Sequence, residues 1–156
     1  MLKHRLIAFT ALGLALFGLG GCKGKPLPPE GEVISLSLGG GHMTRDSFYN
    51  YYLREKDGQV LLDTHYWVVS GDDYREIILE NAEAAQEDLD ALRALCDEYH
   101  FAQRQKDYRK GPFIADAPML GLEAVWENGA RLDADTSFGS EQALRAFFEA
   151  LATRME

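Results

Sequence analysis

The chain has 156 residues, of which 46% are hydrophobic, 26% charged and 11% aromatic, and this composition is typical of a folded domain rather than a disordered segment. Its formal net charge of −9 at pH 7 argues against nucleic-acid binding, because binding to phosphates requires an excess of basic residues. The length indicates one domain with appendages.

The first 21 residues have the parts of an export signal. Lys3 and Arg5 form a short basic region, residues 6–19 form an uncharged apolar run, and Gly20 and Gly21 are small residues at its end. The run is shorter than the roughly 20 residues that span a bilayer. We expect residues 1–21 to be removed, which changes the net charge from −9 to −11 because this segment carries two basic residues and no acid.

The four residues Leu19-Gly20-Gly21-Cys22 resemble the lipobox of bacterial lipoproteins, and the resemblance covers only this N-terminal segment. In that family the cysteine thiol receives diacylglycerol, a peptidase cleaves before the cysteine, and the new amine is usually acylated. The resemblance implies that Cys22 carries the lipid and anchors the chain on the extracytoplasmic side of a membrane. An Asp at the position of Lys23 favours inner-membrane retention in Gram-negative members, so its absence favours the outer membrane where one exists.

Residues 22–31 predict a tether between the lipid and a single domain at residues 32–156. Pro26, Pro28 and Pro29 favour an extended, solvated spacer of up to about 28 Å. If Cys22 is lipidated, Cys96 has no partner for an intrachain disulfide.

Three segments near the start of the domain predict strands, because they alternate in polarity or are rich in aromatic and β-branched residues. They are Val33–Leu38, Ser47–Arg54 and Gln59–Val69. Residues 56–58 predict a three-residue hairpin loop, which would pair Tyr52 with Leu62 and place Tyr49 opposite His65. Phe48 and Tyr52 then lie on one face of the sheet, and Tyr49 and Tyr51 on the other.

Glycine and acidic residues mark two turns. Gly39–Gly41 predicts a turn or bulge after the first strand, with a backbone nest for an anion as the alternative. Ser70–Asp73 predicts a turn rather than a calcium loop, because its carboxylates lack the alternating ligand spacing. Tyr74–Glu80 then predicts a fourth strand, and the start of a helix is the competing interpretation.

The second half of the domain predicts a helix, an irregular segment, a hairpin and a final helix. Residues 84–99 have an apolar stripe at helical spacing, and residues 101–117 are irregular. Pro118–Trp126 and Ala130–Phe138 predict a hairpin, with a three-residue loop that aligns one apolar face by pairing Leu122 with Ala134. The first apolar stripe consists of Ala85, Leu89, Leu92, Cys96 and Tyr99.

The final helix is predicted from Glu141 to Arg154, with Ser140 as its N-cap. Its buried stripe is expected to consist of Leu144, Phe147, Phe148 and Leu151. The whole order, ββββ-α-ββ-α, predicts a two-layer α+β domain with an antiparallel sheet of about six strands and two helices.

Two groups of residues could carry chemistry. Asp63 and His65 share one strand face and, if His42 joins them, could form a metal site or an acid–base pair, although a solvated strand face is the commoner explanation. Cys96 lies on an apolar helix stripe, which indicates a core residue rather than a nucleophile.

A basic cluster interrupts the acidic chain between residues 101 and 117. It consists of Arg104, Lys106, Arg109 and Lys110. Most such segments are simply solvated, and the alternative is a surface that contacts lipid headgroups, an anionic glycan or an acidic partner. The other candidate contact surface is the set of strand aromatics left outside the core, unless the segment 101–117 covers it.

These patterns favour a lipid-anchored protein of the cell envelope, whose domain is a non-enzymatic binding or assembly module without a cofactor. The expected partners are the membrane, through the lipid, and an envelope protein or glycan. The alternative is a small hydrolase or metal-dependent enzyme that uses the face with Asp63 and His65.

Overall fold

A computed structural model describes residues 25–41, 47–112 and 119–156. Within these residues the chain forms one six-stranded antiparallel sheet and three helices, with the strand order β4-β3-β2-β1-β5-β6. The elements are β1 (Val33–Gly41), β2 (Tyr49–Lys56), β3 (Gln59–Ser70), β4 (Asp73–Ala84), α1 (Gln86–Glu98), α2 (Phe101–Asp107), β5 (Met119–Trp126), β6 (Arg131–Ala134) and α3 (Glu141–Met155). Cys22 and the other residues of the lipobox-like segment lie outside the described residues.

The predicted α+β class is confirmed, and the number of helices is corrected from two to three. The described elements run ββββ-αα-ββ-α, because α2 lies in the segment predicted to be irregular. It begins after His100, whose positive φ of 57° turns the chain at the end of α1. With seven residues, of which only Phe101 and Gln105 are buried, α2 is too short to show a helical period in the sequence.

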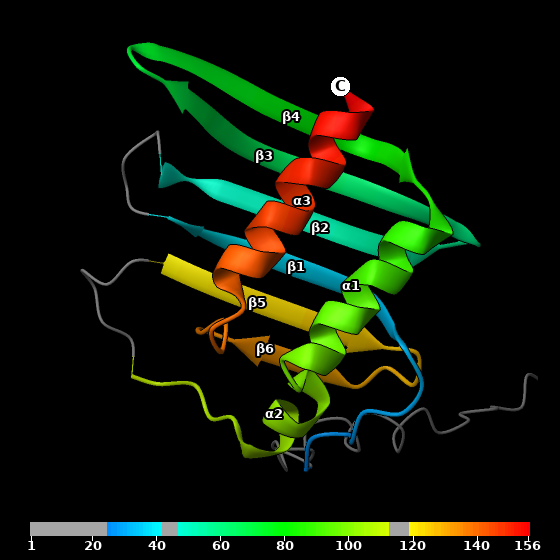
Figure 1. Ribbon diagram of the computed structural model, residues 1–156. Helices are drawn as coiled ribbons and strands as arrows, with labels where there is room; N and C mark the ends of the chain where they lie inside the picture. Colours follow the sequence, from blue (N-terminus) through cyan, green and yellow to red (C-terminus); the bar gives the residue numbers. More distant parts are fainter. Residues whose placement is uncertain (1–24, 42–46, 113–118) are drawn as a thin grey trace, which may run out of the picture.

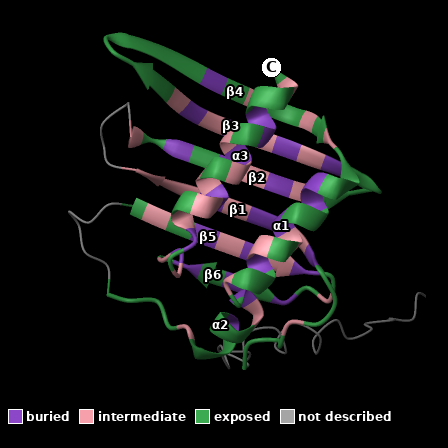
Figure 2. Cartoon of the chain, in the orientation of Figure 1, coloured by how far each residue is buried: buried purple, intermediate pink, exposed green. Residues whose placement is uncertain are grey.

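Helices α1 and α3 lie across one face of the sheet (Figure 1), and the buried residues gather between these two layers (Figure 2). Because side chains alternate along a strand, Leu36 and Leu38 of β1 and Tyr51 and Leu53 of β2 all point toward the helices and are fully buried. The sheet therefore has one face in the core and one face that α1 and α3 leave uncovered.

The predicted helix stripes are largely confirmed. Six of their residues are buried, namely Leu89, Leu92, Cys96, Leu144, Phe148 and Leu151. Phe148 stacks flat on the ring of Tyr51, with centroids 5.0 Å apart, which docks α3 onto the centre of the sheet. Phe147 and Tyr99 are half-buried, and Ala85 is exposed because it precedes the first turn of α1.

Ser140 is the N-cap residue of α3, as predicted, but its side chain does not cap the helix. Its hydroxyl donates a hydrogen bond to the carbonyl oxygen of Ser137 at 2.6 Å. Ser140 is buried in a tight turn and has helical backbone angles, whereas a capping side chain needs an extended backbone.

The β2–β3 loop has two residues rather than the three predicted. Asp57 and Gly58 both have positive φ, of 53° and 78°, as a tight type I′ hairpin turn requires. The observed register pairs Leu53 with Leu62 and Tyr52 with Asp63. This register is favoured because it aligns buried residues with buried residues, and a one-residue slip would mix the two faces.

The other strand predictions have mixed outcomes. The three-residue loop between β5 and β6 is confirmed, since Leu122 pairs with Ala134. The predicted strand at Tyr74–Glu80 is confirmed over the alternative of a helix, since residues 73–84 form β4. Gly39–Gly41, however, continue β1 rather than ending it, and their backbone groups pair with β2 and β5. A side chain at Gly40 would collide with the Tyr49 hydroxyl, which explains the glycine at this position of the strand.

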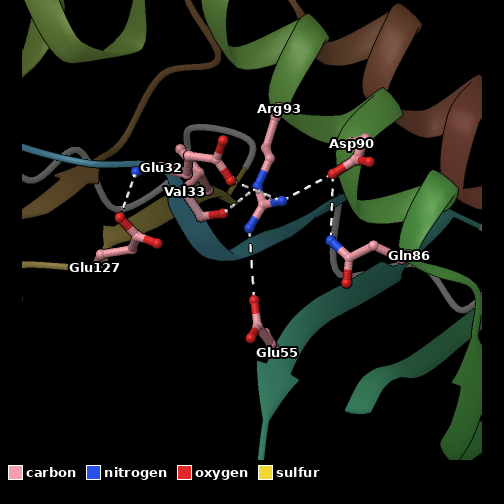
Figure 3. A network of polar contacts seen from close by, with 7 residues as sticks. All are labelled: Glu32, Val33, Glu55, Gln86, Asp90, Arg93 and Glu127. Carbon is pink, nitrogen blue, oxygen red and sulfur yellow. Dashed lines mark hydrogen bonds and ion pairs between the residues drawn. The ribbon is translucent and has the colours of Figure 1, made fainter. Parts of the chain in front are cut away.

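Arg93 of α1 holds together the point where the chain enters the domain (Figure 3). Its guanidinium donates to the carbonyl oxygen of Val33 at 3.0 Å and forms ion pairs with Glu32 at 2.9 Å, Asp90 at 2.8 Å and Glu55 at 3.5 Å. The side chain is only 15% exposed, so these contacts are better shielded from water than those of a surface ion pair.

The described part of the predicted tether does not extend freely into solvent. The carbonyl oxygens of Leu27 and Pro28 accept hydrogen bonds of 2.8 Å from the side chains of Gln105 and Asn128. Residues 25–28 and 30–32 are nevertheless exposed, so the interpretation of residues 23–31 as a solvated spacer stays a prediction.

Cys96 is a core residue, and this predicts an unreactive thiol. It is 3% exposed, and burial, with a smaller effect of Asp97, raises its pKa to about 12. The thiol therefore stays protonated at pH 8, whereas the thiolate is the nucleophile.

We expect the Cys22→Ala chain to react negligibly with a thiol reagent at pH 8 when folded and completely in urea. As a control, Asp72→Cys in the same background places a thiol on an exposed turn and should react at once. Rapid modification of Cys96 in the folded chain would contradict the assignment.

Candidate binding surface on the uncovered sheet face

The face of the sheet opposite α1 and α3 is formed by outward-pointing residues of β1, β2, β3 and β5, which we call the uncovered face. It consists of Ser35, Ser37, Asn50, Tyr52, Arg54, Asp63, His65, Trp67 and Glu123. Serine hydroxyls, an amide, an imidazole, aromatic rings and charged groups of both signs alternate with the core residues of the same strands. Such a mixed face can stay in water or bind a partner of similar polarity.

Two shallow depressions on this face meet at Asn50. One, of about 460 Å³, is lined by residues of β2, β3 and β4 that include Asp63 and His65. The other, of about 320 Å³, is lined by Ser35, Ser37, Tyr52 and Glu123 as well as Asn50. Because Asn50 is exposed and borders both, its amide can donate and accept hydrogen bonds at the centre of the face.

His65 lies against a carboxylate and an aromatic ring. Its Nε2 is 2.8 Å from Oε1 of Glu76, the β4 residue that pairs with Trp67, and the Phe48 ring meets it edge-on with centroids 5.3 Å apart. The side chain is 41% exposed. Glu76 and Phe48 thus fix the orientation of an imidazole that solvent can reach.

Asp63 holds an irregularity in the neighbouring edge strand. It accepts a hydrogen bond of 2.6 Å from the backbone N–H of Asn81 and pairs with Arg54, which also donates to the Asn81 side chain at 2.6 Å. Asn81 has a positive φ of 50°, and the β3–β4 register shifts next to it. Asp63 and Arg54 therefore stabilise a β-bulge in β4.

The structure separates the partners that the sequence grouped together. Asp63 and His65 do lie on the same face, as predicted, but Asp63 is engaged by Arg54 while His65 is engaged by Glu76. His42 lies outside the described residues. Within residues 25–41, 47–112 and 119–156, no three His, Cys, Asp or Glu side chains are grouped to hold a metal ion.

The predicted division of the strand aromatics is confirmed. Phe48, which is 39% exposed, and Tyr52 lie on the uncovered face, whereas Tyr49 and Tyr51 are buried under α3. The prediction that Tyr49 lies opposite His65 is wrong, because the two-residue turn puts Asn50 there. The segment suggested as a cover packs elsewhere in its described part, since Phe101 and Tyr108 both contact the ring of Phe138.

The two buried tyrosines donate hydrogen bonds to carboxylates of α3. The hydroxyl of Tyr49 is 2.7 Å from Glu141, and that of Tyr51 is 3.1 Å from Glu149. Burial first, and then these carboxylates, raise the pKa of both phenols, so both stay protonated donors. A depression of about 520 Å³ borders Glu141, Arg145 and Glu149. These side chains are already engaged, because Arg145 pairs with Glu149 and lies over the Tyr49 ring, and both carboxylates accept hydrogen bonds from the tyrosines.

The basic cluster lies at one end of the domain, away from the uncovered face. Arg104 and Lys106 belong to α2, and Arg109 and Lys110 follow it; all four are exposed. Arg104 stacks over the Phe138 ring at 5.5 Å, and Lys110 pairs with Asp133 at 2.8 Å. The sequence predicted that all four residues lie in a loop, whereas Arg104 and Lys106 lie in helix α2.

Comparison with known proteins finds no matching family model, no matching characterised protein and no matching solved structure. Among the helices of the described residues, none combines the length and the apolar character that crossing a membrane requires.

The role of Asp63 can be tested by stability. We expect Asp63→Ala to lower the free energy of unfolding by about 1–3 kcal/mol, because it removes the ion pair with Arg54 and leaves the Asn81 N–H without its acceptor. Urea unfolding measures this change. The control is Asp72→Ala on the exposed β3–β4 turn, which should change stability by less than about 0.5 kcal/mol. Equal effects of the two substitutions would show that Asp63 does not support the bulge.

Proposed function

We propose that this chain is a lipid-anchored protein of the bacterial cell envelope whose domain binds a protein or glycan partner on the extracytoplasmic side. The anchor rests on the resemblance of residues 19–22 to a lipobox, in which Cys22 is the acylated residue. The binding role rests on one observation, the uncovered face of the sheet around Asn50.

Three properties of the uncovered face support binding. Tyr52 and Trp67 are only partly covered and offer flat apolar area, and the surrounding amide, hydroxyl and carboxylate groups offer hydrogen bonds. The depressions are shallow and adjoin each other at Asn50, so they suit an extended partner rather than an enclosed small molecule. The pairing of Arg54 with Asp63 and of His65 with Glu76 also holds the face in one shape before a partner arrives.

The alternative is a small hydrolase on the same face. The observation in its favour is the pair of His65 and Glu76, since a carboxylate that orients an imidazole is the usual companion of a general base. Binding is the better supported function, because the predicted partner Asp63 is committed to Arg54 and the backbone of Asn81.

The anchor is tested by metabolic labelling with a palmitate analogue. We expect the native chain to incorporate the label and Cys22→Ala to lose it and to accumulate at the length of the uncleaved precursor. Cys96→Ala is the matched control, since Cys96 is buried and should not influence labelling. Label retained by Cys22→Ala would refute the proposed lipid attachment.

The binding face is tested by site-specific photocrosslinking in the native envelope. We expect a photoreactive amino acid in place of Tyr52 to give a discrete adduct, because the partner would lie directly against it. The matched control is the same amino acid at Ala150, an exposed position of α3 on the opposite side of the domain. The proposal fails if positions 50, 52 and 67 all give no adduct, or if position 150 gives the same adducts.

A further inference from the structure

The segment that leads into the domain is fastened to it at several points. Gln105 of α2 is only 7% exposed, and its amide donates to the Leu27 carbonyl at 2.8 Å. Asn128, in the β5–β6 turn, donates to the Pro28 carbonyl at the same distance. Breaking the bond to Leu27 would leave a donor of the buried Gln105 amide without its partner, which costs free energy.

The fastening continues to the first strand. The backbone N–H of Glu32 donates to the Glu127 side chain at 3.1 Å, and the backbone N–H of Glu127 donates to the Glu32 carbonyl at 3.0 Å. Arg93 then pairs with the Glu32 carboxylate (Figure 3). Residues 27–33 are thus held along the end of the domain formed by α2 and the β5–β6 turn.

This arrangement leaves little free chain between the domain and the proposed anchor. Only Lys23 to Pro26 separate Cys22 from the first fastened residue, Leu27. Even fully extended, the chain from Cys22 to Leu27 reaches no more than about 18 Å. If Cys22 carries the lipid, as proposed above, the α2 end of the domain lies next to the bilayer. The β3–β4 turn and the C terminus lie at the opposite end (Figure 1).

The end of the domain that would face the bilayer carries the basic cluster, with the acidic residues Asp133 and Asp135 beside it. Residues 101–112 contain four basic residues and one acid, in a chain with a formal net charge of −9. Lys106 and Arg109 are exposed, and Arg104 is held on the Phe138 ring with its guanidinium at the surface. An anionic membrane would attract this end and repel the acidic remainder, which favours one orientation of the domain.

We propose that α2 and residues 108–110 form a membrane-contact surface, in which Arg104, Lys106 and Arg109 bind the phosphates of anionic lipid headgroups. The inference rests on the proposed lipid anchor, because a tether of at most about 18 Å allows these side chains to approach the headgroups, whose charge acts over about 8 Å at physiological salt. The same short tether favours lipid over an acidic protein as the occupant of this surface.

The proposal is tested by energy transfer from the domain to the membrane. The mature protein, purified with its lipid and with Cys96→Ala, is placed in phosphatidylcholine vesicles with or without phosphatidylglycerol. A donor dye is attached at Gln103→Cys on α2 or at Asp72→Cys on the far turn, and the acceptor is a headgroup-labelled lipid. We expect higher transfer from position 103 than from position 72, and a further rise at position 103 with phosphatidylglycerol.

Charge reversal distinguishes headgroup binding by these basic residues from mere proximity of α2 to the bilayer. We expect Lys106→Glu with Arg109→Glu to abolish the rise caused by phosphatidylglycerol, as should about 1 M salt, where the screening length falls to about 3 Å. The matched control is Lys56→Glu with Arg75→Glu, which changes the net charge equally at other positions and should keep the rise.

Flotation of the vesicles distinguishes the two proposals. A chain that fails to float with vesicles overturns the lipid anchor and the orientation with it. A chain that floats but shows equal transfer from positions 103 and 72, or a rise that survives charge reversal, overturns the membrane-contact surface and leaves the anchor intact.

Discussion

The structure depends on the packing of α1 and α3 against a single face of the sheet. Side chains that alternate along β1, β2 and β3 put Leu36, Tyr51 and Leu62 under these helices. The next residues along the same strands must then point the other way. Burial of one face, with Phe148 stacked on Tyr51 at its centre, therefore creates the polar face on the other side and fixes the spacing of its groups. The candidate binding surface is a direct consequence of the core.

The uncovered face and the entry segment, residues 27–33, occupy different parts of the domain. The groups around Asn50 lie on the open side of the central strands, whereas Gln105, Asn128 and Arg93 hold the entry segment at one end of the domain. Contact with a membrane at that end would not use the residues around Asn50. The proposed anchoring and the proposed partner binding therefore do not compete for the same side chains.

Local patterns predicted most of the elements but not their irregularities. The β5–β6 register followed from the sequence because only a three-residue loop keeps Arg131 and Asp133 off the apolar face. The length of the β2–β3 turn did not follow from the sequence. It depends on a positive φ at Asp57, which an aspartate can adopt but does not have to adopt. The short helix α2 was missed because one buried ring, Phe101, gives no periodic signal.

By itself, the sequence determined that one face of the sheet is apolar, that Cys96 belongs to a helix stripe, and that Asp63 and His65 share a strand face. These properties depend on neighbours a few residues apart, which periodicity reveals. Only the tertiary structure decided that Asp63 supports the bulge at Asn81 and that Gln105 holds Leu27, 78 residues away. Such contacts depend on how distant segments pack, and no local pattern specifies a hydrogen bond between elements that only the complete fold brings together.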